Sequence, residues 1–218
     1  VGFAVVGVFV LWFGWFGFNA GSELAMDNWV AHCIMTTLLA GSAGVVGAGA
    51  AIWRKTGAMD VGMAGNGALA GLVSITAGTG TMSFAGSVAV GFIGGVIVVY
   101  SVLFIERRGI DDPVGAVSVH GVCGAWGTLA IGFFARHDDA FLGRDDAGLF
   151  YGGGFDQLLV QAIGVVIVAV WVLGTTAILF KVLKSTVGLR VSAEEELAGL
   201  DVAEHGSPGY GPEPVLVG

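Results

Sequence analysis

Hydrophobic positions in this sequence gather into six long runs, and the short segments between them carry nearly all of the charged residues. The pattern is plainest over residues 61–105 and 157–180, which contain no charged residue at all. An apolar run of about 20 residues covers the hydrocarbon core of a bilayer, which is roughly 30 Å thick. We therefore predict six membrane helices. They run from the start to Phe18 and over Trp29–Trp53, Met59–Thr76, Phe84–Ile105, Pro113–Phe134 and Leu158–Phe180.

The composition supports an all-α, polytopic membrane protein. The chain is 55% hydrophobic and only 12% charged, with a mean hydropathy of +0.85, whereas soluble domains carry about a quarter charged residues. A net charge of -8 argues against nucleic acid as a partner. The two cysteines, Cys33 and Cys123, lie in different apolar runs without metal-ligand spacing, so no metal or other cofactor is expected. Neither an HExxH nor a GxSxG motif occurs, and no two carboxylates share a span, so we do not expect an enzyme.

The basic residues predict the orientation of the spans. Seven of the nine follow the second, fourth and sixth runs: Arg54, Lys55, Arg107, Arg108, Lys181, Lys184 and Arg190. Successive spans alternate in direction, so these groups share one side, which the positive-inside rule assigns to the cytoplasm. The tail then ends in the cytoplasm. The loop that holds Arg136, Arg144 and the acidic residues 138, 139, 145 and 146 is expected outside.

One ionisable residue lies inside an apolar run. His120 sits in the glycine-studded segment 111–134, which is otherwise uncharged after its acidic start. An ionisable side chain at membrane depth is costly, and it usually faces a pore or a buried partner. Two interpretations follow from the residue alone: a pore-lining histidine, or a structural histidine bonded to a neighbouring backbone carbonyl. The same segment opens with Asp112 and Pro113, a pair typical of an N-cap and a first helical position.

Three blocks of sequence resemble the C-terminal half of the Amt/Mep/Rh ammonium transporters. They are LWFGWFGFNAGS at 11–22, DDPVGAVSVHGVCGAWG at 111–127 and TVGLRVSAEEELAGLDVAEHG at 186–206. The resemblance covers nearly the whole chain. It implies an eleven-helix fold of two inverted repeats plus a last helix, of which the six spans here correspond to helices six to eleven. It divides the chain into a partial transmembrane transporter domain at 1–184 and a cytoplasmic tail at 185–218. It also implies five further spans upstream of Val1, with a histidine inside the fifth.

The same resemblance assigns roles along a transport pathway. His120 matches the second of two pore histidines that share a hydrogen bond and relay a proton. Phe18 matches one of two stacked phenylalanines at the outer mouth, and Leu11, two turns away, is expected to line the pore. Ser22 matches the hydroxyl of an external ammonium site. Trp15 matches the same motif, although a tryptophan at this depth also suits an interfacial anchor.

Three positions are less decisive. Asp112, near the pore, is expected either to cap its helix or to handle the cation directly. Some relatives carry an acidic residue where this chain has Gly115, which weakens any proposal for a second carboxylate there. Thr76 is expected near the outer vestibule. In the tail, Ser192 is a predicted N-cap for a short helix, and residues 208–218 have the composition of a disordered segment.

The resemblance implies passage of ammonium or ammonia across the cytoplasmic membrane, with this chain supplying one half of the pore. Expected partners are the lipid bilayer, two further copies in a homotrimer and a PII-type signalling protein at the cytoplasmic face. Two alternatives stay open. One is an ammonium sensor or regulatory membrane protein, and the other is a truncated chain that is inactive on its own.

Overall fold

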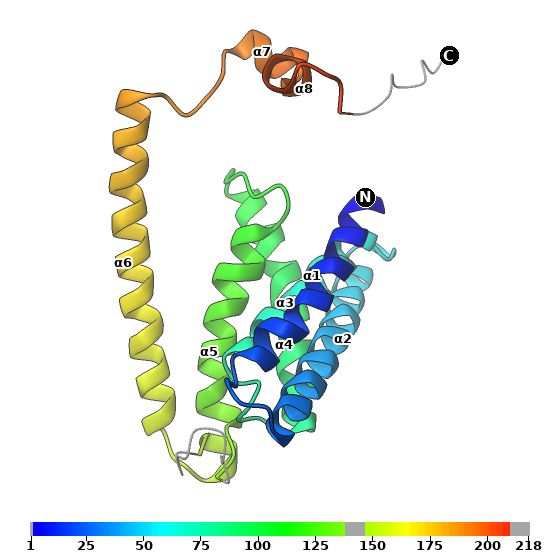
Figure 1. Ribbon diagram of the computed structural model, residues 1–218, viewed down its shortest axis with the longest axis vertical. Coiled ribbons are helices and arrows are strands. Elements are labelled where there is room, and N and C mark those ends of the chain that lie inside the picture. Colours follow the sequence, from blue (N-terminus) through cyan, green and yellow to red (C-terminus); the bar gives the residue numbers. More distant parts are fainter. Residues whose placement is uncertain (1, 138–146, 210–218) are drawn as a thin grey trace. The chain divides into compact units, whose positions relative to one another are not determined.

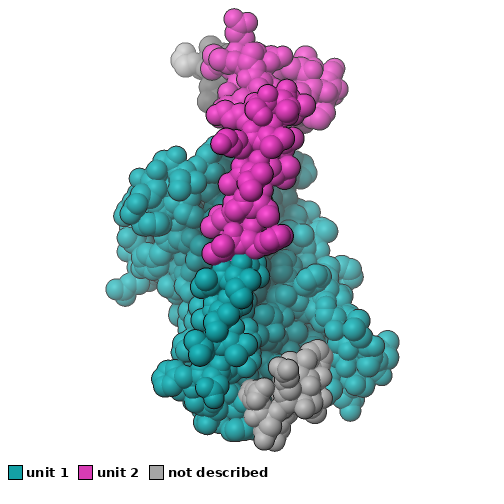
Figure 2. All heavy atoms as spheres, turned by 90° about the vertical axis from the view of Figure 1, so that its left-hand side faces the viewer, with its two compact units in different colours: residues 1–168 teal, residues 169–218 magenta. Residues whose placement is uncertain are grey.

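The computed structural model describes residues 2–137 and 147–209, and within these ranges the chain is helical without a named strand. The residues group into two compact units, 1–168 and 169–218 (Figure 2). The elements follow one another along the chain as shown in Figure 1. They are α1 (Gly2–Gly21), α2 (Asn28–Thr56), α3 (Val61–Thr76), α4 (Phe84–Arg107), η1 (Val117–Val122), α5 (Cys123–Phe134), η2 (Leu149–Tyr151), α6 (Asp156–Thr186), α7 (Ala193–Ala198) and α8 (Leu200–His205).

All six predicted membrane helices are present, with η1 and α5 together forming the fifth. Among the described residues, five helical segments are long and apolar enough to cross a bilayer: α1, α2, α4, η1–α5 and α6. The remaining predicted span, α3, has 16 residues and a length of about 24 Å, which is shorter than the hydrocarbon core. A glycine- and threonine-rich turn at 77–81 follows α3, and most of its residues are buried.

Side-chain caps fix where α2, α3 and α4 begin. The carboxylate of Asp27 accepts a hydrogen bond from the Trp29 amide at 2.7 Å, and Asp60 accepts one from the Met63 amide at 2.7 Å. The hydroxyl of Ser83 caps α4 in the same way. These bonds satisfy backbone donors that a helix start leaves unpaired. The caps therefore define the polar boundaries between successive spans.

The core of unit 1 lies where α2 packs along both α3 and α4. Glycine makes this approach possible at Gly44 of α2. A Cβ atom on Gly44 would collide with the Gly67 carbonyl and come within 2.9 Å of the Gly71 Cα atom. Gly91 of α4 meets the Ala40 backbone in the same way. Small residues let helix backbones pack closely in a membrane, where no hydrophobic force drives association.

We expect Gly44→Val to destabilise unit 1 by about 1–3 kcal/mol, because overpacking a close helix contact forces the helices apart. The measurement is thermal unfolding of the full-length gene product in mild detergent. Gly164→Val in α6 is the matched control, since no heavy atom lies within 4 Å of a Cβ built there. Equal losses of stability in the two variants would contradict the close contact at Gly44.

Unit 2 contains the end of α6 and the two short helices of the tail. Ser192 forms a capping box with Glu195: the Ser192 hydroxyl accepts from the Glu195 amide, and the Glu195 carboxylate accepts from the Ser192 hydroxyl and amide. These bonds, chiefly the one from the hydroxyl, lower the pKa of the exposed Glu195 carboxyl. Arg190 pairs with Glu196. The predicted N-cap at Ser192 is confirmed.

The single short helix expected after Ser192 is in fact two helices, α7 and α8. Gly199 separates them with a φ of 88°, a left-handed backbone that interrupts the helical path. Residues 138–146 and 210–218 lie outside the described residues. The expected outer acidic loop and most of the expected disordered end therefore fall outside them as well.

Candidate functional site

His120 is carried by a π-helical segment at the start of the fifth span. Residues 117–122 form η1, and the helix returns to α-helical geometry at Cys123. Short π-helical turns are rare, and they occur frequently at functional sites. The imidazole of His120 is exposed, and within residues 2–137 and 147–209 it has no hydrogen-bond partner. The bond to a neighbouring backbone carbonyl that a structural histidine would make is therefore absent from the described part of the chain.

Asp112 holds the start of the segment that carries His120. Its side chain is only 6% exposed, and its two carboxylate oxygens accept from the amides of Val117 at 3.1 Å and Ser118 at 3.3 Å. The Ser118 hydroxyl lies 3.5 Å from the same carboxylate and accepts from Ser101 of α4 at 2.9 Å. The carboxylate thus satisfies the free amides at the start of the helix and ties that start to α4.

The predicted helix start at Asp112 and Pro113 is wrong in position. Residues 112–115 form a turn, closed by a bond from the Gly115 amide to the Asp112 carbonyl, and η1 begins only at Val117. Gly115 has a φ of 72°, which favours glycine over a residue with a side chain. A Cβ atom at Gly115 would also come within 2.8 Å of the Asn66 amide nitrogen. Asp112 does cap the helix, as predicted, but the amides that it caps belong to Val117 and Ser118, five and six residues further along the chain.

Leu11, Trp15 and Phe18 lie on one stripe of α1, because they are spaced by four and three positions, and Ser22 continues this spacing four residues later. Leu11 is 52% exposed and Phe18 is 61% exposed, so both present apolar surface away from the bundle. Trp15 lies between them, and its ring meets Phe18 edge to face at 6.0 Å. Ser22 follows directly after the helix and is exposed.

The polar atoms of Trp15 and Ser22 differ in how free they are to bind a ligand. The Trp15 indole N–H donates to the Thr76 hydroxyl at 2.8 Å, so the polar end of Trp15 binds α1 to the end of α3. The Ser22 hydroxyl donates to the Phe18 carbonyl at 2.7 Å. Its oxygen keeps lone pairs that can accept from a cation such as ammonium. Ser22 therefore offers an acceptor oxygen four residues after the exposed aromatic ring of Phe18.

Helix α3 links the two parts of the candidate site. It packs against α1 on one side and against η1 and α5 on the other (Figure 1). Thr76 of α3 contacts Trp15, and Gly124, one turn after His120, faces Val73 of α3. The structure therefore brings Trp15, Phe18 and Thr76 together at one end of α1. The π-helical segment that carries His120 packs against the same helix, α3.

A buried hydroxyl network near this end of α1 was not predicted. The Asn19 amide donates to the Thr37 hydroxyl at 3.0 Å, and Thr79 lies within 3.3 Å of the hydroxyls of both Thr36 and Thr37. Asn19 and both α2 threonines are buried. The only sequence signals were a threonine pair inside the second run and a threonine-rich turn after the third. Asn19 thus links α1 to α2, and Thr79 links α2 to the turn after α3.

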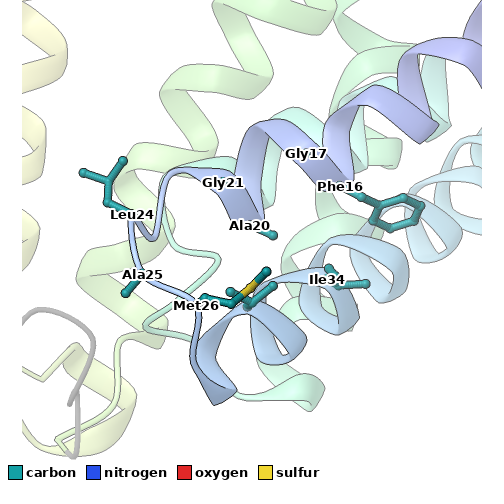
Figure 3. Close-up of a pocket in the computed structure, with 9 residues that line it drawn as sticks. Phe16, Gly17, Ala20, Gly21, Leu24, Ala25, Met26 and Ile34 are labelled. Carbon is teal, nitrogen blue, oxygen red and sulfur yellow. The ribbon is translucent and has the colours of Figure 1, made fainter.

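An apolar groove of about 610 Å³ opens between the end of α1 and the start of α2 (Figure 3). Its lining contains no titratable side chain and none of the predicted site residues. The lining residues are Phe16, Gly17, Ala20, Gly21, Leu24, Ala25, Met26, Val30 and Ile34. It lies on another face of α1 from the stripe of Leu11 and Phe18, so it adds no group suited to binding a cation.

Comparison with known proteins gives a consistent result. A profile of the Ammonium Transporter Family matches residues 1–210. The ammonium transporter Amt2 of Archaeoglobus fulgidus is 46% identical over 95% of this chain and 45% of its own length. The ammonium transporter of Bacillus subtilis is 35% identical, over 95% of this chain and 51% of its own length. The chain thus spans about half the length of the curated relatives it matches.

Solved structures agree with the sequence comparison. A structure described as a Sensor Amt Protein superposes with a TM-score of 0.82 and 38% identity over 91% of this chain and 48% of that chain. Mep2 of Candida albicans gives a TM-score of 0.81 with 30% identity over 88% of this chain and 43% of that chain. These matches confirm the predicted fold class, a partial polytopic helical membrane fold.

Proposed function

The chain belongs to the ammonium transporter family, and we propose that it supplies one half of a pathway that carries ammonium or ammonia across the cytoplasmic membrane. The family is one of transporters, so we propose no enzymatic reaction. The observation that carries the proposal is His120: an exposed imidazole in a π-helical turn of a membrane span, without a hydrogen-bond partner among the described residues. A neutral imidazole can donate at one nitrogen and accept at the other.

The pathway we propose begins at the outer end of α1. Ammonium binds there beside the Phe18 ring by cation–π attraction, while the Ser22 oxygen accepts one of its N–H groups. Trp15 supports this end through its bond to Thr76. The cargo then passes Leu11 in an apolar channel and reaches His120. A narrow apolar channel disfavours K⁺ and Na⁺, because these ions cannot lower their desolvation cost by giving up a proton.

We propose a structural role for Asp112. Its carboxylate is buried and already accepts from two backbone amides, so it is less available to a cation than an exposed carboxylate is. Its contribution is to position the turn that presents His120. The partners we propose are two further copies in a homotrimer and a PII-type protein at the cytoplasmic tail, which the resemblance of block 186–206 implies.

The test is reconstitution of the full-length gene product in liposomes that contain a pH-sensitive dye. An inward ammonium gradient is expected to change the internal pH or produce a current well above that of protein-free liposomes. An equal potassium gradient is the control and is expected to give no such response. Equal responses to both cations would contradict a selective ammonium pathway.

A sensor is the second candidate, favoured by the likeness to the solved Sensor Amt Protein. The same preparation separates the two functions. Saturable ammonium binding that raises the thermal stability of the protein, without any flux, would favour the sensor over the transporter.

A further inference from the structure

Four basic side chains stand together at the ends of two helices that are packed along each other. Arg54 and Lys55 are in the last turn of α2, and Arg107 and Arg108 end α4. All four are exposed, and none has an ion-pair partner among the described residues. The second and fourth spans run in the same direction, and their ends carry the charge that predicts the cytoplasmic side. The cluster therefore lies at the expected level of the inner leaflet headgroups.

Two of these cations rest on a strip of aromatic surface. The Lys55 ammonium lies 5.4 Å from the centre of the Tyr100 ring, and the Arg108 guanidinium lies 4.8 Å from the centre of the Phe104 ring. Tyr100 and Phe104 are four residues apart on α4, so their rings occupy the same face one turn apart. The two rings are 47% and 56% exposed. One cation from each helix is thus held beside the same apolar, outward-facing strip.

The nearest acidic side chain on α4 does not neutralise this pair. Glu106 is two residues from Phe104, which places it on the opposite side of the helix. It lines a separate groove together with Asp60, Asn66 and Gly115. The aromatic strip therefore carries two positive charges without a matching carboxylate on its own face.

We propose that Lys55 and Arg108 bind the phosphate of an acidic phospholipid in the inner leaflet, whose first acyl carbons lie along Tyr100 and Phe104. We call these four residues the lipid clamp. Basic groups between membrane helices on the cytoplasmic side suit anionic headgroups, and aromatic rings favour the interface between headgroups and acyl chains. Arg108 presents a planar fork of donors to phosphate oxygens, and Lys55 adds a point charge. This site does not depend on the proposed transport function.

The experiment is native mass spectrometry of the full-length gene product in mild detergent, titrated with phosphatidylglycerol or phosphatidylcholine. The test variant is K55Q/R108Q. The matched control is R54Q/R107Q, which removes the same charge from the same helix ends but leaves the clamp intact. We expect the test variant to lose the preference for phosphatidylglycerol by about fivefold per charge removed. The control is expected to change it by less than about twofold.

Three further variants keep the test decisive if K55Q/R108Q folds poorly. K55Q and R54Q form a single-substitution pair with the same logic. Y100L/F104L keeps all four charges and removes the aromatic strip, and we expect it to weaken phosphatidylglycerol binding as well. Unchanged binding in Y100L/F104L would overturn the role of the rings.

Three other outcomes would overturn the proposal. Equal losses in the test and control variants would indicate a diffuse basic belt. Displacement of phosphatidylglycerol by equimolar glycerol phosphate or inorganic phosphate would indicate a site for small soluble anions. A change of oligomeric state in K55Q/R108Q, with lipid preference intact, would indicate that a second copy of the chain covers this face.

Discussion

His120→Ala is expected to reduce ammonium flux through the full-length gene product about 5- to 150-fold while leaving the protein folded. The resemblance to the ammonium transporters implies that His120 is paired with a second imidazole, with which it relays a proton. Removing one partner leaves the other unsatisfied in an apolar channel, at a cost of about 1–3 kcal/mol, and also breaks the path of the proton. The measurement is the initial rate of ammonium-driven pH change in liposomes, normalised to the amount of folded protein.

Val122→Ala is the control for this experiment. Val122 lies in the same π-helical turn and is 37% exposed, so the substitution also removes exposed side-chain atoms from η1 but leaves the imidazole in place. Its flux is expected to stay near that of the unmodified protein. A His120→Ala variant with undiminished rate and selectivity would show that the histidine serves the fold rather than the pathway.

The surroundings of His120 explain why a loss of flux is expected without a loss of fold. The turn around His120 is held by bonds that do not involve its ring: Asp112 accepts from the amides of Val117 and Ser118, and Ser118 is linked to Ser101. The imidazole is exposed, whereas its neighbours Ser118 and Val119 are buried. Folding and chemistry are therefore carried by different residues of one helical turn.

The positions of the membrane helices follow from hydrophobic pattern alone, because a bilayer requires each span to be a long apolar run. The Ser192 cap follows from its serine three residues before Glu195, a local signal. The start of the fifth span could not be predicted in this way. Its first helical amides are capped by a carboxylate five and six residues upstream, and the turn between depends on the left-handed backbone of Gly115. These are features of tertiary structure rather than of a local motif.

In the candidate site, too, the placement of residues along one helix follows from the sequence, whereas the contacts between helices do not. The resemblance selected Leu11, Trp15, Phe18 and Ser22 together, and their helical spacing alone is enough to place them on one stripe. Their hydrogen bonds were not accessible from sequence. The pairing of Trp15 with Thr76 joins residues 61 positions apart, and the network of Asn19 with Thr37 joins residues 18 apart. Such contacts exist only after the helices have packed, so spacing within one helix cannot predict them.

The residues 1–218 expressed alone are expected to give no ammonium flux above that of empty vesicles. Leu11 and Phe18 are more than half exposed, and His120 lacks a hydrogen-bond partner among the described residues. A pathway between two inverted halves needs both walls, and in the pathway that we propose these side chains line only one of them. We also expect the segment to aggregate or to be degraded unless a complementary half is co-expressed, because exposed apolar side chains such as Leu11 and Phe18 would lack the facing wall that the proposed pathway requires.

The measurement is ammonium uptake by vesicles that contain only this segment, with the His120→Ala form of the same segment as control. The two preparations are expected to be indistinguishable from each other and from lipid alone. Because Phe18 and His120 would each need a partner, a positive result requires two copies to face each other. The prediction would be contradicted by uptake that exceeds the lipid background and is abolished by His120→Ala. Such a result would mean that two copies of this half assemble a pore by themselves.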